Sequence, residues 1–256
     1  MAAIVLILVY FSFVVGMACL MWKFARVPFP PKATVLSTNE MEFPDEARTD
    51  LRAVSQELAV LGFQSAEAIR LDYGSLSTAF SVAFKGQGTT FAVYHFHTGS
   101  RSSYVEFRTC SSRYEDLVSI ARYPTAIESA GPAAGLLLMV PPMPNYSLLA
   151  FHEAARARIL GDEVLPIPAE LATHLFAFHD FRFERAFSNK TMVLRNGTAR
   201  FRWPHLLRFA ALTLPPFRFI ESARNRARAR RILAEVPAGR FNAIRSALAL
   251  AERKER

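Results

Sequence analysis

The chain has 256 residues, of which 51% are hydrophobic, and its formal net charge at pH 7 is +9. With 22 Phe among its residues it can bury a substantial core, which argues against wholesale intrinsic disorder. Its two cysteines, Cys19 and Cys110, are too few for a disulfide-rich secreted scaffold and fit a reducing compartment.

The first predicted element is an uncharged run of 20 residues from Ala3 to Trp22. As a helix rising ~1.5 Å per residue, the run would be about 30 Å long, which matches the hydrocarbon core of a bilayer. Lys23, Arg26 and Lys32 follow the run, whereas no basic side chain precedes it. The positive-inside rule therefore predicts a single-pass transmembrane anchor over 1–22, with the N-terminus outside and the bulk of the chain in the cytoplasm.

A cleaved secretory signal is the alternative interpretation of the same run. The triplet from Gly16 to Ala18 has the small-x-small pattern of a cleavage site. However, a basic n-region is missing and apolar residues continue past Cys19, which favours a membrane span.

The next elements are a linker, a helix and a set of strands. Segment 23–44 contains four prolines and no helical period, which predicts a linker. Apolar residues then recur at helical spacing from Asp45 to Leu61, and Gly62 is a plausible helix stop. Alternating apolar residues predict an antiparallel β-meander, and a short apolar run predicts a buried strand. The expected strands are 68–73, 80–84, 91–97, 104–109 and 135–140.

Helical spacing returns in the second half of the chain, at 146–160 and 168–187. The pair Asn196-Gly197 predicts a tight hairpin, and three basic helices are expected at 204–214, 217–235 and 239–252. The predicted fold class is α+β: one N-terminal transmembrane helix, an antiparallel β-meander with packed helices, and a basic helical C-terminal region. This layout is similar to that of single-span proteins of the bacterial inner membrane. The expected organisation is an anchor (1–22), a linker (23–44), a cytoplasmic α+β domain (45–200) and a basic helical region (201–256).

The positive charge is concentrated at the C-terminal end. From residue 200 onward, 14 Lys and Arg stand against 4 Asp and Glu, whereas the first 199 residues hold 17 against 18. An apolar, aromatic segment beside arginines is typical of contact with anionic lipid headgroups, although the same pattern also fits core residues with solvated arginines outside. The residues predicted to contact the membrane surface are Trp203, Arg208, Arg218, Arg224, Arg226, Arg228, Arg230 and Arg231.

The strand motif "YHFH" places His95 and His97 on one face of a strand. Two imidazoles in this arrangement can share a metal ion such as zinc or copper. A third ligand is required, and the available donors include His152, Glu153 and His174. The alternative interpretation is a pair of strand histidines that make ordinary hydrogen bonds.

The sequence contains no Walker loop, no nucleophile elbow and no zinc-protease motif. The favoured function is therefore non-enzymatic and without a cofactor: a single-span membrane protein whose cytoplasmic domain binds a partner protein or the anionic membrane surface. A membrane-tethered enzyme or metal-binding module using His95 and His97 is the alternative. A second alternative is nonspecific nucleic-acid binding through the Arg-rich tail, which the membrane anchor disfavours.

Overall fold

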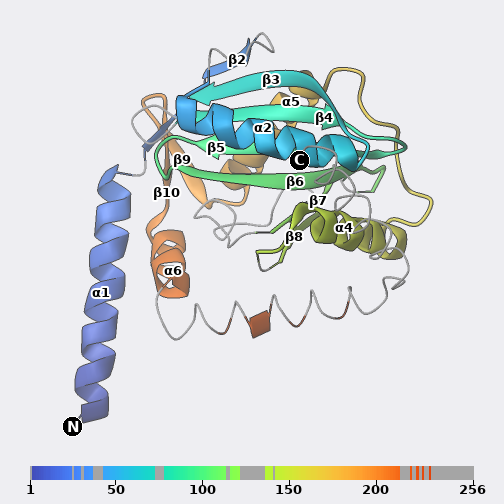
Figure 1. Cartoon of the computed structure of the whole chain (residues 1–256). Coiled ribbons are helices and arrows are strands. Elements are labelled where there is room, and N and C mark those ends of the chain that lie inside the picture. The colour runs from blue at the N-terminus through green and yellow to red at the C-terminus, as the bar shows by residue number, and fades with distance from the viewer. Residues whose placement is uncertain are drawn as a thin grey trace.

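The chain combines helices with a seven-stranded, mostly antiparallel sheet and a smaller three-stranded sheet, so the predicted α+β class is confirmed (Figure 1). Most of the basic region predicted after residue 214 lies outside the described residues. This computed structural model describes residues 2–24, 26–29, 32–36, 43–72, 78–113, 116–121, 136–140, 142–213, 220, 223–224, 227 and 231.

The large sheet holds its seven strands in the order in which they occur along the chain. Neighbouring strands are antiparallel except for the last pair, β7 and β8, which is parallel. The predicted meander is present, with β7 as a strand that the alternation did not indicate. The strands are β2 (Lys32–Leu36), β3 (Gln64–Asp72), β4 (Thr78–Lys85), β5 (Thr90–His97), β6 (Ser102–Cys110), β7 (Asp116–Ile120) and β8 (Leu136–Met139).

Helices cover both faces of the large sheet, because successive strand residues point to opposite sides and both sides are apolar. On one face Leu58 and Phe107 belong to a core shared by two helices and the sheet. On the other face Leu175 packs with Phe91. Figure 1 shows α2 in front of the sheet and α5 behind it. The helices are α2 (Asp45–Val60) and α4 (Asn145–Ile159) on the first face and α5 (Leu171–Ser188) on the second.

The predicted limits of α2 have a clear physical basis. Asp45 and Glu46 place negative charge in the first turn, where it interacts favourably with the helix dipole. At the other end Gly62 adopts a φ of +89°, and the Phe63 N–H donates to the Leu58 carbonyl at 2.9 Å. Glycine takes this left-handed conformation without steric cost, so it ends the helix as predicted.

The smaller sheet joins the beginning of the chain to its later part. Its strand order is β1-β10-β9, with both pairs antiparallel. The predicted hairpin is present: Asn196 and Gly197 have φ of 50° and 69°, the positive values that a two-residue turn of this kind requires. The strands are β1 (Arg26–Pro28), β9 (Met192–Arg195) and β10 (Thr198–Phe201).

Two segments that we expected to be linker are therefore strands. β1 is a short edge strand that ends at Pro28, and β2 is an edge strand of the large sheet. Proline is tolerated at such edges because one side of an edge strand makes no ladder hydrogen bonds. The composition that suggested a linker is thus compatible with two sheet edges.

Two helices extend side by side from the smaller sheet (Figure 1). At one end of the pair the indole of Trp22 stacks on that of Trp203, with ring centroids 6.0 Å apart. Further along, the Tyr10 hydroxyl donates to the Ala211 carbonyl at 3.0 Å. These contacts show that the helices run antiparallel. They are α1 (Ala2–Phe24) and α6 (Trp203–Thr213).

Small side chains allow α1 and α6 to pack closely. Ala18 of α1 and Ala210 of α6 are both fully buried, in an apolar cluster that also contains Val14 and Leu206. Small residues at a helix–helix contact let the two backbones approach each other. This cluster is distinct from the cores on the two faces of the large sheet.

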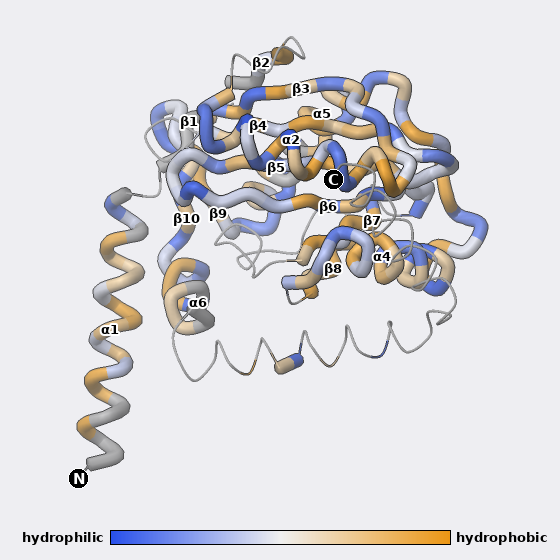
Figure 2. Tube along the Cα trace, in the orientation of Figure 1, coloured by the Kyte–Doolittle hydropathy of each residue, from blue (hydrophilic) through white to orange (hydrophobic). Residues whose placement is uncertain are grey.

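Apolar residues recur along α1, as the orange segments of its tube show in Figure 2, and several of their side chains are exposed. Its side chains are described without interruption only over residues 8–20. Within the described part of the chain, no helix is long and apolar enough to cross a membrane. The span predicted from Ala3 to Trp22 is therefore not supported by these residues and stays a prediction. The exposed apolar side chains of α1 are Val5, Leu8, Val9, Phe11, Phe13, Leu20 and Trp22.

Candidate functional site

A row of polar side chains crosses the sheet face that α5 covers, and we call it the polar stripe. Strand register brings its members together, because Ser81 pairs with His95 across β4 and β5, and alternate residues of β6 point to the same face. The stripe lies between apolar neighbours such as Phe91 and Leu175. Its members are Ser81, His95, Glu106, Arg108, Asp116 and His174.

The centre of the stripe is Arg108, which lies between two carboxylates. Its Nε donates to Glu106 Oε1 at 2.6 Å, and its Nη1 donates to Asp116 Oδ2 at 3.0 Å. All three side chains are buried, and the Phe178 ring of α5 lies 4.4 Å from the guanidinium carbon. Buried charges of this kind are stable only when they are paired and hydrogen-bonded, as they are here.

Burial and ion pairing shift the pKa values of Glu106 and Arg108 in opposite directions. Burial raises the pKa of Glu106, but the stronger combined attraction of Arg108 and His95 holds that pKa well below its usual range. Burial lowers the pKa of Arg108, whereas Glu106 and Asp116 together raise it above its ordinary value. The carboxylate and the guanidinium therefore both carry their charges within the fold.

His95 connects the stripe to the second strand histidine. Its Nδ1 lies 2.7 Å from Ser81 Oγ, and its Nε2 lies 2.9 Å from Glu106 Oε1. Tyr104 stacks on both imidazole rings, with centroid distances of 4.9 Å to His95 and 5.8 Å to His97. The two histidines share a face as expected, their ring centroids 6.4 Å apart.

A different set of metal donors converges at the other end of the stripe. His174 Nε2 lies 3.0 Å from Asp116 Oδ1 and 3.6 Å from Cys110 Sγ. Within the described part of the chain, this is the only group of three or more donor side chains whose ligand atoms lie within 4.8 Å of one another. The metal site predicted at His95 and His97 is not tested by this geometry and stays a prediction.

The Cys110 thiol is a poor nucleophile in this setting. Burial raises its pKa well above the ordinary range, and the negative charge of Asp116 raises it further. Because the thiolate is the reactive form, covalent catalysis by this cysteine is disfavoured without a bound cation. Arg108 lowers this pKa by less than burial and Asp116 raise it, and a bound cation next to the sulfur would favour deprotonation.

His152, which the sequence offers as a possible metal donor, lies in α4 and contacts the sheet. Its Nε2 lies 2.9 Å from Thr109 Oγ1, and its Nδ1 lies 2.9 Å from Ser119 Oγ. Burial, followed by the charge of Arg156, lowers its pKa to about 3. The ring is therefore neutral at physiological pH and links two strand hydroxyls to a helix.

Four of the residues predicted to contact the membrane surface are described, and all four are exposed. Trp203 begins α6, Arg208 lies one and a half turns later, and Arg224 and Arg231 also have helical conformation. The other four lie outside the described residues: Arg218, Arg226, Arg228 and Arg230.

Sequence reasoning found His174 as a candidate donor but missed its partners. Cys110 and Asp116 are register partners across β6 and β7, so finding them required β7. That strand is five residues long and entirely buried, and it therefore shows no alternation. In comparisons with protein-family models, curated proteins and solved structures, none matched the chain.

Proposed function

We propose that this protein is a membrane-anchored binding protein, with α1 as a single span and the sheet domain on the cytoplasmic side. The observation that carries the proposal is the outer surface of α1, where Leu8, Phe11 and Phe13 are 60%, 61% and 66% exposed. Burying a side chain of this size is worth about 1.5–3 kcal/mol. Lipid would cover these side chains, whereas water leaves them exposed.

The end of α1 also suits a membrane boundary. Trp22 has the amphipathic ring typical of the interface, and Lys23 follows it in the last turn. The basic residues after α1 favour the cytoplasmic side for the rest of the chain. The exposed side chains of Arg224 and Arg231 supply charge for anionic lipid, at about 1 kcal/mol per residue close to the surface.

Membrane fractionation of the full chain tests the anchor. We expect the protein to stay in the pellet after alkaline carbonate extraction. Phe11→Arg combined with Phe13→Arg should release it, because each arginine at a helix centre costs about 2.5–3.5 kcal/mol on the insertion scale. Phe11→Leu combined with Phe13→Leu is the matched control and should remain in the pellet. Retention of the arginine variant, or release of the unaltered chain, would contradict the proposal.

A protease added to sealed vesicles tests the orientation. Inverted vesicles, whose cytoplasmic face points outward, should lose the sheet domain. Vesicles of native orientation should protect it. The opposite pattern would place the domain on the other side of the membrane.

A transition-metal site at Cys110, Asp116 and His174 is a second candidate function. Donor atoms around a tetrahedral zinc ion are roughly 3.3–3.8 Å apart, given metal–ligand distances of about 2.0–2.3 Å. The observed separations of 3.0 Å and 3.6 Å are near this range. Arg108 already donates to the other oxygen of Asp116, and hydrogen bonds of this kind orient the carboxylates that bind metal ions.

Cobalt titration distinguishes this site from the one predicted at the strand histidines. If the Cys110 site binds, Co²⁺ should give thiolate charge-transfer absorption, and Cys110→Ser or His174→Ala should abolish it. His97→Ala should have no effect. Visible Co²⁺ d–d bands without thiolate charge transfer, lost in His97→Ala and retained in Cys110→Ser, would instead favour the pair of strand histidines.

A further inference from the structure

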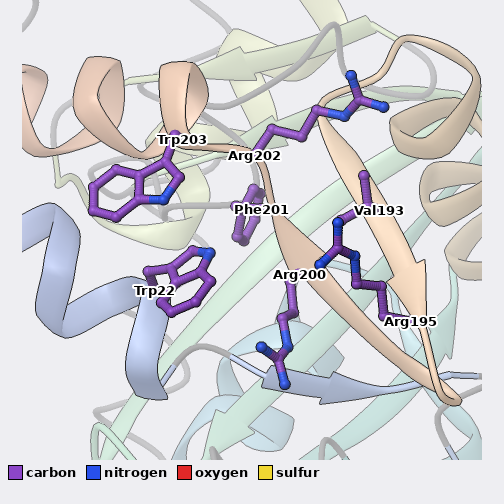
Figure 3. A pocket seen from close by; sticks show the side chains of 7 residues that line it. All are labelled: Trp22, Val193, Arg195, Arg200, Phe201, Arg202 and Trp203. Carbon is purple, nitrogen blue, oxygen red and sulfur yellow. The ribbon is translucent and has the colours of Figure 1, made fainter.

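A pocket of about 280 Å³ lies where α1 meets the β9–β10 hairpin (Figure 3). Figure 3 shows the two indole rings side by side and the arginine side chains spread over the hairpin. Three aromatic and three basic side chains dominate its lining, and we call it the arginine–tryptophan pocket. They are Trp22, Phe201, Trp203, Arg195, Arg200 and Arg202.

The fold assembles this pocket from three elements. The turn at Asn196 and Gly197 places Arg195 and Arg200 on adjacent strands. Arg202 links β10 to α6, and α6 begins with an indole and has no acidic residue in its first turn. The N-terminus of a helix carries partial positive charge, so α6 adds to the potential of the arginines.

The positive charge of the pocket is unbalanced. No carboxylate lines it, and no carboxylate in the described part of the chain pairs with Arg195, Arg200 or Arg202. The Nε of Arg200 is shielded from solvent and has no hydrogen-bond acceptor among the described residues. A buried donor without an acceptor destabilises the fold, so an acceptor supplied by a ligand would be favourable.

The aromatic side chains indicate which anion fits. The guanidinium carbon of Arg200 lies 5.8 Å from the ring centroid of Trp22, which in turn stacks on Trp203. An amphipathic aromatic wall beside guanidinium groups suits a ligand with a charged end and an apolar end. At about 280 Å³ the pocket is near the lower limit for small-molecule sites, about 300 Å³, so it fits a headgroup better than a whole lipid.

We propose that the arginine–tryptophan pocket binds the phosphate group of an anionic phospholipid headgroup. Arg200 donates to a phosphate oxygen through its Nε, Arg195 and Arg202 add positive charge around it, and the two indoles pack on the glycerol and the first acyl carbons. This inference rests on the proposed function, because α1 in a bilayer would bring Trp22 to the interface where headgroups lie. An inorganic phosphate ion could bind the same arginines, but it has no apolar part that could pack on the indoles.

The chain contains only two tryptophans, and both line the pocket. Fluorescence excited at the indole band therefore reports on this site alone. The full chain, purified in neutral detergent, is titrated with short-chain phosphatidylglycerol, with phosphatidylcholine of the same chain length, and with inorganic phosphate. We expect a saturable change with phosphatidylglycerol and little change with the other two. Equal responses to both lipids, or a phosphate response of the same affinity, would overturn the lipid assignment.

Single substitutions locate the binding. Arg200→Gln should weaken phosphatidylglycerol binding at least about tenfold, since a hydrogen bond to a charged group is worth about 1.5–3 kcal/mol. Arg195→Gln, at an exposed position that tolerates change, should also weaken it. Arg101→Gln removes the same charge from the exposed turn between β5 and β6, outside the pocket, and should leave the affinity unchanged at physiological salt. An Arg101→Gln effect as large as that of Arg200→Gln would overturn the pocket in favour of diffuse surface charge.

Flotation with neutral vesicles separates this inference from the proposed function. If the full chain floats with phosphatidylcholine vesicles but shows no lipid preference by fluorescence, the pocket assignment fails and the anchor stands. If the chain does not float with any vesicle, the anchor fails as well. Flotation together with a phosphatidylglycerol-specific response that Arg200→Gln removes supports both.

Discussion

At the scale of single residues, the polar stripe depends on one cation shared by two anions. Arg108 donates hydrogen bonds to both Glu106 and Asp116. His95 lies against the same Glu106 oxygen, and His174 lies against the other oxygen of Asp116. The two carboxylates carry two negative charges and the guanidinium carries one positive charge. Each buried charge of the stripe therefore relies on its hydrogen-bonded neighbours for its stability. Removing one leaves another buried without its partner, which costs more than the pair contributes in isolation.

Glu106→Gln should lower the free energy of unfolding by about 3–5 kcal/mol, because it removes a buried charge that pairs with Arg108. The matched control is Glu46→Gln, which breaks an exposed pair with Arg101 and should cost less than about 1 kcal/mol. Chemical denaturation of the three proteins gives the comparison. Equal losses in both variants would mean that the stripe contributes no more than a surface ion pair.

His152 should make stability depend on pH in a defined window. Its pKa falls from 6.5 in the unfolded chain to about 3 in the fold, so only the unfolded state binds a proton between these values. The stabilisation is complete above about pH 6.5 and is lost as the pH falls towards about 3. Denaturation at about pH 5 should give a free energy of unfolding about 2 kcal/mol lower than at about pH 7. His152→Gln should remove this difference, and an unchanged difference in that variant would assign it to another group.

At the scale of elements, the most extensive helix–helix contact in the described part of the chain is that between α1 and α6. Ala18 and Ala210 are fully buried there, whereas Gly16 of α1 faces open space, where a Cβ atom would have no neighbour within 4 Å. The two sides of α1 are therefore physically different. The side of α1 that carries Ala18 packs against α6, whereas the side that carries Gly16 faces open space.

Ala18→Leu should separate the two helices, and we expect it to cost about 1–3 kcal/mol through overpacking. Gly16→Leu adds the same side chain on the open side and should cost nothing comparable. Thermal unfolding in detergent measures both, and tryptophan fluorescence reports whether Trp22 still stacks on Trp203. An equal response of the two variants would contradict the close packing of α1 on α6.

An element can be predicted from the sequence when the pattern that indicates it lies within a few neighbouring residues. β4, β5 and β6 alternate in hydropathy and were predicted, as was the hairpin at Asn196-Gly197, because both patterns lie within a few residues. The shared face of His95 and His97 follows from the same alternation. β1, β2 and β7 were missed, since edge strands and fully buried strands lack it. The clustering of Cys110 with Asp116 and the arginine–tryptophan pocket depend on pairing between distant segments, which no local pattern encodes.

At the scale of the whole molecule, the buried apolar side chains form separate clusters. The cores on the two faces of the large sheet contain no residue of α1, whereas the cluster at the smaller sheet includes Val14 and Ala18. The large sheet with α2, α4 and α5 therefore depends little on the N-terminal helix. The smaller sheet and α6 depend on it directly.

Deletion of residues 2–24 should leave the main cooperative unfolding transition in place and abolish recovery in the membrane pellet. The newly exposed surface of α6 around Leu206 should also reduce solubility without detergent, because apolar area then faces water. Calorimetry and fractionation of the truncated and full chains measure the two effects. Loss of the main transition would show that α1 stabilises the large sheet after all.

The pairing of β1 with β10 also sets an order of events during biosynthesis. Arg26 aligns with Arg200, so the strand that follows α1 has no partner until the ribosome has made most of the polypeptide. At about 5–20 residues per second the delay is roughly ten to thirty seconds. During that interval the strands of the large sheet can pair with one another before β1 meets β10. Trp22 and Trp203 meet only in a nearly finished chain, so premature termination before β10 yields a product that contains α1 but lacks the pocket.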